Sequence, residues 1–499
     1  MNKRSVIWGL GVLLFSLYCA AAAGAKDGLI VVNHREATTM DPIAYKDFAS
    51  HQTCRLLYDT LIYLDFSNGR VEPSLAESWE LLSDREYKFN LRKGVKFHNG
   101  DEMTAEDVRY SILRTMTPDT QTADYLKNVQ DVQAVDDYTV ILRLKNVDYS
   151  FLPSLSHCWS SIVSKKAVEK TGKDFGANPV GTGPFKLASW QMGRQYVLER
   201  FEEYWGPKAK IRTLEVRSVP EPSKRMKELQ SGQADIIFPL TRSHAKQVER
   251  SWNLVLYRQP QDSLLYLGFN CAKKPFDDVR VRRAISAALD IEKIQAPLWN
   301  DEGEAPRSLI PASIRYSIDS ELKPHVQDVE LAEKLLAEAG IRNLKLEIWT
   351  DQRRERIGMA TEIVAQLREV GIAAEVRVLE RDAYLKGLKA KIHDLYLLSW
   401  TLPVPDPNFA VSALLETGAS FNYAFFSDGK LDELLSKGRG VPDGEERAAI
   451  YREVQLYVNE QLPMIYLWSD NLALGAQNYV KGLLSDYDYA YSFREIYLE

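Results

Sequence analysis

The stretch GTGPFKLASW, residues 181–190, contains glycines in the manner of a phosphate-binding loop, so nucleotide chemistry is the first possibility to test. A dinucleotide-binding fingerprint requires a third glycine where Lys186 stands, and a Walker loop requires Gly-Lys-Ser/Thr at a spacing that Pro184 interrupts. Pro184 also removes one of the backbone N–H donors that would bind an anion. Beyond Pro184 the apolar-polar alternation is that of a strand, without a helix start. The stretch is not a phosphate site, and its two glycines need a structural explanation.

Motifs of enzymes and of metal sites are absent from the sequence. There is no G-x-S-x-G elbow, no S-x-x-K set and no H-E-x-x-H pair, so no hydrolytic machinery stands out. The seven histidines are scattered without metal-ligand spacing, and no pair of cysteines has such spacing either. We predict a protein that is not an enzyme and that uses no cofactor and no metal.

Side chains suited to binding follow two predicted strands. NLKLEIW, residues 343–349, alternates like a strand and leads to Asp351 and Arg353, whereas DLYLLSW, residues 394–400, ends at Trp400. In open α/β sheets, ligands bind beyond the carboxyl ends of the strands. Arginine holds a carboxylate through paired hydrogen bonds, and tryptophan supplies a flat apolar wall. The alternatives are core packing for Trp400 and, for the run QRRER that contains Arg353, a solvated helix face.

These strands must be positioned by two regions with strand-helix-strand order. Residues 213–240 read as the strand TLEVRSV, a short helix stopped by Gly232, and the strand ADIIFPL. Residues 343–400 repeat this order, with a helix over residues 356–370 between strands. No long linker rich in Gly, Ser or Pro separates the regions, so we expect two α/β lobes joined at a hinge.

Residues 60–184 predict a different unit, mixed and largely antiparallel. Alternating apolar residues indicate strands over residues 87–97 and 137–145. Between them a helix opens with a capping box from Thr104 to Asp107.

The N-terminus has the three parts of a secretory signal peptide. Lys3 and Arg4 precede an uncharged apolar run, and small residues around Ala25 form a cleavage site, so we expect residues 1–25 to be removed and the protein to be periplasmic. The run is also near the length of a membrane anchor. Lipoprotein anchoring at Cys19 is a third possibility, but Tyr18 stands where a small residue is needed.

The remaining chain has the composition of a soluble globular protein with room for roughly two to four domains. The full sequence has a mean hydropathy of −0.30, and its net charge of −6 with 26% charged residues gives no basic surface typical of nucleic-acid binding. Cys54, Cys158 and Cys271 form at most one bridge, and the sequence does not choose the pair.

An ordered set of motifs then resembles a known family. The motifs run from about Asp41 to Phe409: TMDP, LLYDTLIYLD, PSLAESWE, KFNLRKGVKFHNGDEMTAEDVRYSI, SIVSKKAVE, NPVGTGPFKLASW, YWG, LGFNCAKKPFDDVRVRRAISAALD and PDPNF. Together they closely resemble the bacterial solute-binding proteins of ABC importers, family 5, which comprises peptide- and nickel-binding proteins. The resemblance covers essentially the whole chain after the predicted signal peptide.

The resemblance implies an α/β, two-lobed periplasmic-binding-protein (Venus flytrap) fold with an extra mixed α+β subdomain on the first lobe. The expected divisions are 26–60 and 185–270 for the first lobe, 61–184 for the subdomain, 271–469 for the second lobe, and 470–499 for a C-terminal part of the first lobe. The chain would leave the subdomain at about the GTGP stretch. Gly181 and Gly183 would then be turn residues with backbone angles that other residues resist.

The implied function is to capture a ligand, an oligopeptide or dipeptide, between the lobes and to deliver it to the membrane permease of an ABC importer. We expect a monomer with a small-molecule or peptide ligand and no nucleic-acid partner. An exported hydrolase or a chaperone is the rival class. From family position and strand ends, the predicted ligand-binding residues are Tyr45, Lys46, Asp262, Ser263, Arg353, Arg354, Trp400, Thr401, Asn422 and Tyr423.

One position departs from the family pattern. Peptide binders of this family have W-x-x-D before P-D-P, and that aspartate pairs with the α-amino group of the peptide, but here Pro403 occupies its place. Because a buried, unpaired ammonium costs several kcal/mol, Asp262 or Asp47 would have to replace it. The alternative is a ligand without a free amino terminus: a blocked or modified peptide, a sugar-like compound or a chelated metal.

Overall fold

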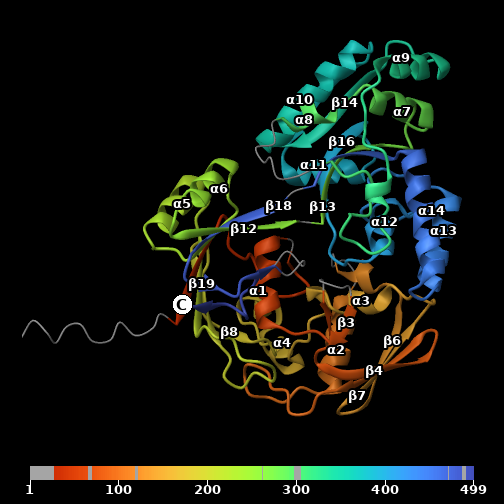
Figure 1. Cartoon of the computed structure of the whole chain (residues 1–499). Helices are drawn as coiled ribbons and strands as arrows, with labels where there is room; N and C mark the ends of the chain where they lie inside the picture. The colour runs from red at the N-terminus through yellow and green to blue at the C-terminus, as the bar shows by residue number, and fades with distance from the viewer. Residues whose placement is uncertain are drawn as a thin grey trace, which may run out of the picture.

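The computed structural model describes residues 27–45, 47–65, 70–117, 122–260, 262–296, 305–469, 471–485 and 491–499. The chain forms two α/β lobes and a subdomain at the lower end of the first lobe (Figure 1). This arrangement confirms the predicted fold class. The predicted signal peptide and Cys19 lie outside the described residues, as does Lys46.

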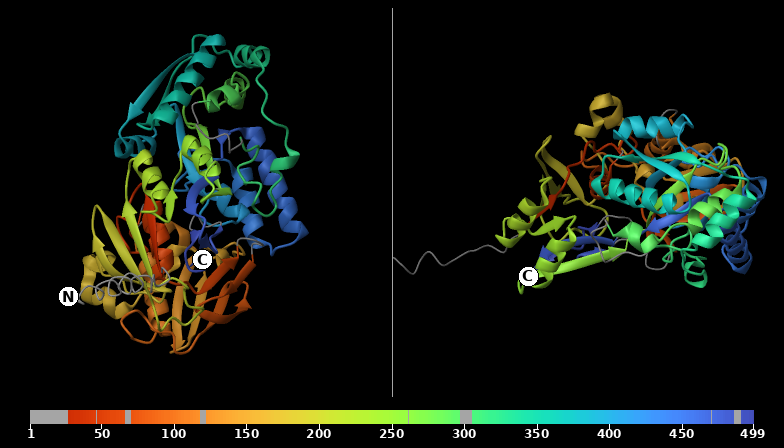
Figure 2. Two further views of the ribbon diagram at one scale, coloured as in Figure 1. Left: turned by 60° about the vertical axis from the view of Figure 1, so that its left-hand side comes forward. Right: turned by 90° about the horizontal axis from the view of Figure 1, so that it is seen from above.

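The first lobe contains a seven-stranded sheet assembled from distant parts of the chain. In spatial order its strands are β12 (Leu254–Pro260), β18 (Asn471–Gln477), β11 (Ile236–Phe238), β1 (Gly28–Asn33), β10 (Thr213–Ser218), β9 (Gln195–Arg200) and β8 (Phe185–Gln191). Strand β1 is parallel to β10 and β11, and the outer strands pair antiparallel. Figure 2 shows the N-terminal strand and the C-terminal segments together in this lobe, where only β11 separates β1 from β18.

The helices of the first lobe are α1 (Phe48–Leu57), α5 (Pro222–Gln230) and α6 (Arg242–Glu249), and the C-terminal tail adds β19 (Val480–Lys481), β20 (Leu484–Ser485), β21 (Tyr491–Ser492) and β22 (Tyr497–Leu498). The predicted strand-helix-strand unit of residues 213–240 is confirmed as β10, α5 and β11. Helix α5 stops before Gly232, whose φ of +73° ends the helix in a conformation that glycine adopts readily.

The subdomain contains a four-stranded antiparallel sheet covered by a helix. Its sheet has the order β4 (Ala76–Ser83), β5 (Glu86–Leu91), β7 (Thr139–Leu144) and β6 (Val129–Asp136), and its other elements are β2 (Ile62–Asp65), β3 (Arg70–Pro73), α2 (Ala105–Thr115), α3 (Phe151–Ser154) and the 3₁₀ turn η1 (Ala123–Leu126). The chain then returns to the first lobe through the 3₁₀ turn η2 (Cys158–Ser160), α4 (Lys165–Thr171) and the 3₁₀ turn η3 (Gly172–Ala177), whose buried residues Cys158, Ala167, Val168 and Phe175 pack in the first-lobe core. The predicted capping box of α2 is present. The strand predicted over residues 87–97 ends at Leu91, because the chain turns at Gly94 with φ +72°.

The second lobe contains a five-stranded sheet flanked by helices. Its strands in spatial order are β15 (Ala373–Leu379), β14 (Lys345–Asp351), β16 (Leu395–Thr401), β13 (Ser263–Phe269) and β17 (Met464–Trp468); its helices are α7 (Val279–Ala287), α8 (Ile291–Gln295), α9 (Val329–Glu338), α10 (Arg354–Glu369), α11 (Arg381–Lys389), α12 (Pro407–Leu415), α13 (Gly429–Gly440) and α14 (Glu445–Gln461), with the 3₁₀ turn η4 (Asp319–Glu321). β14 is parallel to β15 and β16, as expected for strand-helix-strand units. Apolar side chains bury both faces of this sheet: Ile348 packs in one core and Trp349 in the other.

Two strand-to-strand passages connect the lobes. The chain leaves β12 in the first sheet and enters β13 in the second, and it returns from β17 to β18. Because β13 pairs with β16 and β17, residues 263–269 lie in the second lobe, whereas the predicted boundary at residue 270 assigned them to the first. The apolar sequence of β13 fits either sheet, so only its pairing decides.

Gly181 and Gly183 have an architectural role, but for a different physical reason from the predicted one. Neither has a left-handed φ among the described residues. A Cβ on Gly181 would lie 2.1 Å from the carbonyl oxygen of Leu57, and one on Gly183 would lie 2.6 Å from the backbone nitrogen of Tyr58. The stretch therefore needs glycine because it passes against the end of α1, just before Phe185 begins β8.

The described residues contain no helix that is both long and apolar enough to cross a membrane. Within the same residues, no group of three His, Cys, Asp or Glu side chains converges as metal ligands would. Cys54, Cys158 and Cys271 are free thiols.

Candidate functional site

Aromatic rings from both lobes and the subdomain form a continuous series of ring contacts, which we call the aromatic row. Its members are Tyr45 and His51 of the first lobe, Tyr125 of the subdomain, His157 and Trp159 of the segment that leads from the subdomain back to the first lobe, and Trp400, Phe409 and Phe421 of the second lobe. The row is thus the place where all three parts of the molecule meet.

At the first-lobe end, the rings also carry polar contacts. The Tyr45 and His51 ring centroids are 5.5 Å apart, His51 and His157 are 4.9 Å apart, and His157 stacks on Trp159 at 3.4 Å. The Tyr45 hydroxyl lies 3.2 Å from Nδ1 of His51 and 3.5 Å from Nδ1 of His157. These contacts hold the two imidazoles in fixed orientations.

At the second-lobe end, stacked rings cross the interface between the subdomain and the second lobe. Trp159 and Tyr125 are nearly parallel, with centroids 3.7 Å apart, and Tyr125 lies 5.6 Å from Phe409 and 6.2 Å from Phe421. Phe421 in turn lies 5.0 Å from Trp400 at the end of β16. Such offset contacts add about 0.5–1.5 kcal/mol each beyond burial.

Two indole N–H groups in the row have no hydrogen-bond acceptor among the residues that the structure describes. They are Nε1 of Trp159 and Nε1 of Trp400, and both nitrogen atoms are buried. A buried donor without an acceptor costs about 1–3 kcal/mol, so each such atom in a native structure calls for an explanation. A ligand bound along the row would supply the missing acceptors for both N–H groups.

A carboxyl group lies close to the second-lobe end of the row. Asp262 precedes β13, and its backbone oxygen accepts a hydrogen bond of 2.8 Å from the N–H of Leu402, next to Pro403. Its side chain is 6% exposed and accepts a hydrogen bond from the Ser313 hydroxyl. Burial raises the pKa of Asp262 to about 6, although the Ser313 hydrogen bond acts in the opposite direction.

An arginine cluster lies at the carboxyl end of β14. Arg353, Arg356 and Arg381 contact the Asp351 carboxylate at 2.7, 3.1 and 3.0 Å, respectively. Burial would raise the pKa of Asp351, but the hydrogen bond from Arg353 and the charges of Arg356 and Arg353 hold it at about 2. Three guanidinium groups around one carboxylate leave a net positive charge at this edge of the sheet.

The three arginines differ in exposure. The Arg356 side chain is 4% exposed and also donates to Oγ of Ser399 in β16, whereas the side chains of Arg353 and Arg381 are about half exposed. The interpretation of QRRER as a solvated face is therefore wrong for Arg356. Its spacing to Ala360 and Ile363, four and seven residues later on the buried face of α10, was the signal that could have identified it.

The other predicted site residues have varied surroundings. Ser263 and Thr401 face each other as the first residue of β13 and the last residue of β16, and Arg354 is an exposed residue at the start of α10. The Asn422 amide donates to the carbonyls of Glu416 and Phe426 and so orders its own loop. Tyr423 is buried in the second-lobe core, while its neighbour Phe421, which the sequence did not suggest, joins the row.

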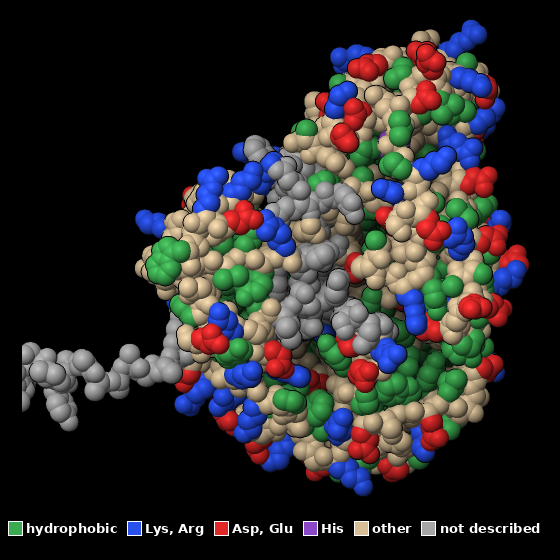
Figure 3. Space-filling model, in the orientation of Figure 1, with side chains coloured by type: hydrophobic (Ala, Val, Ile, Leu, Met, Phe, Trp, Pro, Cys, Tyr) green, Lys and Arg blue, Asp and Glu red, His purple; other side chains and the backbone are tan. Residues whose placement is uncertain are grey.

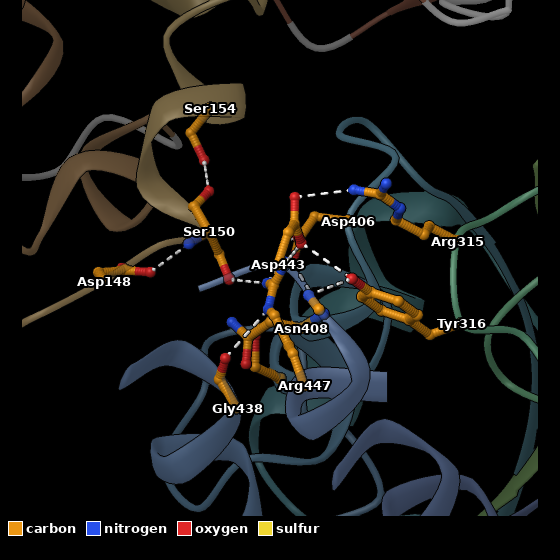
Figure 4. Close-up of polar contacts among 12 residues, drawn as sticks. Asp148, Ser150, Ser154, Arg315, Tyr316, Asp406, Asn408, Gly438, Asp443 and Arg447 are labelled. Atoms are coloured by element: carbon orange, nitrogen blue, oxygen red, sulfur yellow. Dashed lines mark hydrogen bonds and ion pairs between the residues drawn. The ribbon is translucent and has the colours of Figure 1, made fainter. Parts of the chain in front are cut away.

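The second lobe is also hydrogen-bonded directly to the subdomain (Figure 4). Arg447 of α14 donates to the Ser150 hydroxyl at 2.7 Å, to Asp406 at 2.9 Å and to Asp443 at 2.7 Å. Asp406, the acid of the P-D-P motif, also caps α12 through the N–H of Asn408. Its carboxylate therefore joins the subdomain to the second lobe through Arg447.

A cavity of about 810 Å³ lies beside these contacts, between the subdomain and the second lobe. The aromatic row contributes Tyr125, Phe409 and Phe421 to its lining, and Lys127, Lys145 and Arg439 contribute positive charge. Figure 3 shows hydrophobic side chains gathered where the second lobe approaches the subdomain. The volume is in the range of small-ligand sites.

Comparisons with known proteins agree with this architecture. The profile of the bacterial extracellular solute-binding proteins, family 5, matches residues 70–422. The chain is 28% identical to a glutathione-binding protein of Shigella dysenteriae over 99% of both chains, and 27% identical to the dipeptide-binding protein of Escherichia coli over 97% of both. A solved periplasmic binding protein from Helicobacter pylori, in complex with the peptide STSA, superposes with a TM-score of 0.84 at 27% identity, covering 95% of this chain and 98% of that one.

Family membership follows from the profile match, which spans more than half of the chain. The ordered motifs, the two lobes with their subdomain and the row between them are consistent with it. The chain belongs to the bacterial extracellular solute-binding proteins of family 5.

Proposed function

We propose that the protein captures a short peptide between its lobes and presents it to the permease of an ABC importer. Binding in such a protein is a shift of population from an open to a closed arrangement of the lobes, without covalent chemistry or a cofactor. In this proposal residues 1–25 direct export, and the mature chain works outside the cytoplasmic membrane as a monomer, without nucleic acid.

The observation that carries this proposal is the pair of indole donors in the aromatic row. Trp159 and Trp400 each have a buried N–H without an acceptor in the described part of the chain. A peptide backbone offers carbonyl acceptors at regular spacing, and its side chains can pack on the flat faces of the rings. Relatives named for dipeptide and glutathione binding support a peptide over other solutes.

Each charged end of a peptide has a candidate partner of opposite charge in the second lobe. Asp262, beside Pro403, is the proposed partner of the α-amino group, because burial raises its pKa and a cation next to it would stabilise the ionised form. Asp47 is less suitable, because its carboxylate caps α1 and binds Thr38 and Ser50. Arg353 and Arg381 are the proposed partners of the carboxylate, since both are half exposed.

The spacing of these groups suits a short chain. Asp262 and the arginine cluster flank β16 on opposite sides, in β13 and β14, so they are at least two strand spacings, roughly 10 Å, apart. An extended chain advances about 3.3–3.6 Å per residue, so a peptide of about three residues covers that distance.

Titration calorimetry with defined tripeptides tests the proposal. We expect Trp159→Phe and Trp400→Phe, which keep the ring but remove the N–H, to weaken binding about fivefold, equal to about 1 kcal/mol per hydrogen bond. Trp190→Phe is the matched control, because its buried N–H also lacks an acceptor in the described residues but lies outside the row.

Unchanged affinity of both row variants, or equal weakening by Trp190→Phe, would count against the row as the binding surface. Mass spectrometry of ligand released from natively purified protein identifies the class directly. Amino-blocked peptides, a sugar-like compound or a metal chelate as the only bound species would favour the alternative. Peptide turnover by homogeneous protein would favour a hydrolase.

A further inference from the structure

Two of the three cysteines of the described chain lie against each other behind the aromatic row. Cys54 in α1 and Cys158 in η2 are 0% and 1% exposed. On the face of α1 that carries Cys54, His51 stacks on His157 with ring centroids 4.9 Å apart, and Arg55 donates to the backbone oxygen of Ser156 at 3.0 Å, so this contact between α1 and the start of η2 brings the two cysteines together. The two residues belong to the same hydrophobic core. Cys271 lies apart from them, at the end of β13 in the second lobe.

The surroundings of the pair favour thiolate chemistry at one sulfur. Burial would raise the pKa of Cys158, but the neighbouring Cys54 and His51 lower it to about 6. Burial and its donor role toward Cys158 raise the pKa of Cys54. The thiolate is the nucleophile in disulfide exchange, so in the folded chain Cys158 is the more reactive sulfur of the pair.

We propose that Cys54 and Cys158 form a disulfide bond in the exported protein, while Cys271 remains a thiol. Family 5 proteins act outside the cytoplasm, where disulfides form and persist. The structure thereby selects one pair among three that the sequence left open.

The chemistry requires a disulfide-bearing protein oxidant of the export compartment. Before α1 packs, either cysteine can react first; with Cys158 as the first, its thiolate attacks one sulfur of the oxidant, and the other oxidant sulfur leaves as a thiolate. The Cys54 thiolate then attacks the Cys158 sulfur of this mixed disulfide and releases the second oxidant thiol. The pair loses two protons and two electrons, which reduce the oxidant disulfide to a dithiol. Because both sulfurs are buried in the folded chain, the step occurs before α1 packs.

The bridge would fix one wall of the aromatic row. His51 lies one helical turn before Cys54, and His157 and Trp159 flank Cys158 in the chain. A bond between the two sulfurs therefore ties the first-lobe end of the row to the segment that carries Trp159. This consequence for the ligand rests on the proposed function, whereas the bond itself does not.

Alkylation mass spectrometry tests the bond. Cells producing the exported wild-type protein are quenched with a thiol-blocking reagent, and the denatured protein is alkylated with and without prior reduction. We expect one alkylated cysteine, Cys271, before reduction and three after it, together with a cross-linked peptide pair containing Cys54 and Cys158. Three alkylated cysteines without reduction, or a cross-link that includes Cys271, would overturn the proposal. The Cys271→Ser variant is the matched control and should show none before and two after reduction.

Hydrogen exchange and calorimetry test the consequence for the row. We expect the paired variant Cys54→Ala with Cys158→Ala to exchange amide hydrogens in residues 48–57 and 157–160 at least tenfold faster than wild type, and to bind tripeptide about threefold more weakly. Cys271→Ala should change neither. Unchanged exchange in both segments would overturn the fixing of the row. If wild-type protein binds no tripeptide, the proposed function fails, while alkylation and exchange still decide the disulfide.

Discussion

Two buried aspartates on either side of β16 have similarly low exposure and opposite shifts of their pKa values. Asp351 at the end of β14 is 3% exposed, and Asp262 at the entry to β13 is 6% exposed. Burial opposes the charged form of both, yet arginine contacts hold the pKa of Asp351 at about 2, while the pKa of Asp262 is raised to about 6. Burial alone therefore does not set the charge at this edge of the sheet; the neighbouring side chains do.

The difference assigns different roles to the two carboxyls. Asp351 keeps a permanent negative charge that orients three arginines, including the buried Arg356. Asp262 changes its charge near neutral pH and lies beside the loop of Pro403. In the proposed function, the first is a positioning residue and the second contacts the ligand.

The largest expected effect is on stability. Asp351→Asn removes the carboxylate that neutralises buried Arg356, so we expect a loss of about 3 kcal/mol in the free energy of unfolding, as for a buried pair that loses one partner. This is the lower end of the usual range, because Arg353 and Arg381 are half solvated. Urea denaturation measures it. Asp262→Asn should lower the free energy of unfolding by no more than about 1 kcal/mol. Equal losses of stability in the two variants would contradict the different roles of the two aspartates.

The next effect is on affinity. We expect Asp262→Asn to weaken binding of a tripeptide with a free amino terminus about 30-fold, which corresponds to about 2 kcal/mol for loss of one partner of a desolvated charge pair. The N-acetylated form of the same tripeptide is the matched ligand and should lose little. Titration calorimetry of both tripeptides with wild type and with Asp262→Asn measures the coupling energy between Asp262 and the amino group of the ligand. Equal weakening for the two ligands would show that Asp262 does not contact the amino group.

The two aspartates also predict opposite pH dependences. The depressed pKa of Asp351 contributes stability that is present above about pH 4 and is lost as the pH falls toward 2. The raised pKa of Asp262 has the opposite sign: its neutral form is favoured by folding, and that contribution is lost as the pH rises from about 4 to about 6. Ammonium binding needs the ionised form, so affinity for a free tripeptide should rise about tenfold from pH 5 to pH 7. Calorimetry at several pH values should show no such rise in Asp262→Asn.

The local elements could be predicted from the sequence because their signals are local. Alternation and a helical apolar face identified β14, α10 and β16, and the capping box identified the start of α2. The lobe to which β13 belongs could not be predicted, because an apolar strand carries no sign of its pairing partners. The glycine pair was recognised as architectural, but close packing against α1 cannot be distinguished from a special φ in one sequence.

The candidate site could be predicted only at its ends. Strand-end reasoning led to Trp400 and Arg353, because the carboxyl edge of an α/β sheet is the default ligand edge. The middle of the aromatic row comes from Tyr125, Trp159 and Phe421, which are far apart in the chain and come together only through tertiary packing. Whether an arginine in QRRER is solvated or buried likewise depends on β16, which lies beyond the local segment.

The smallest expected effect separates two adjacent arginines. Arg353 contacts Asp351 and is half exposed, whereas Arg354 is an exposed neighbour at the start of α10 and is not among the three arginines that contact that carboxylate. We expect Arg353→Ala to weaken tripeptide binding about fivefold, because Arg381 remains to hold the ligand carboxylate, and Arg354→Ala to leave binding unchanged. A C-terminally amidated tripeptide should bind wild type more weakly and should be insensitive to Arg353→Ala. If both variants weaken binding equally, the arginines act only through the general field of this edge, and the positioning role of Asp351 does not extend to the ligand.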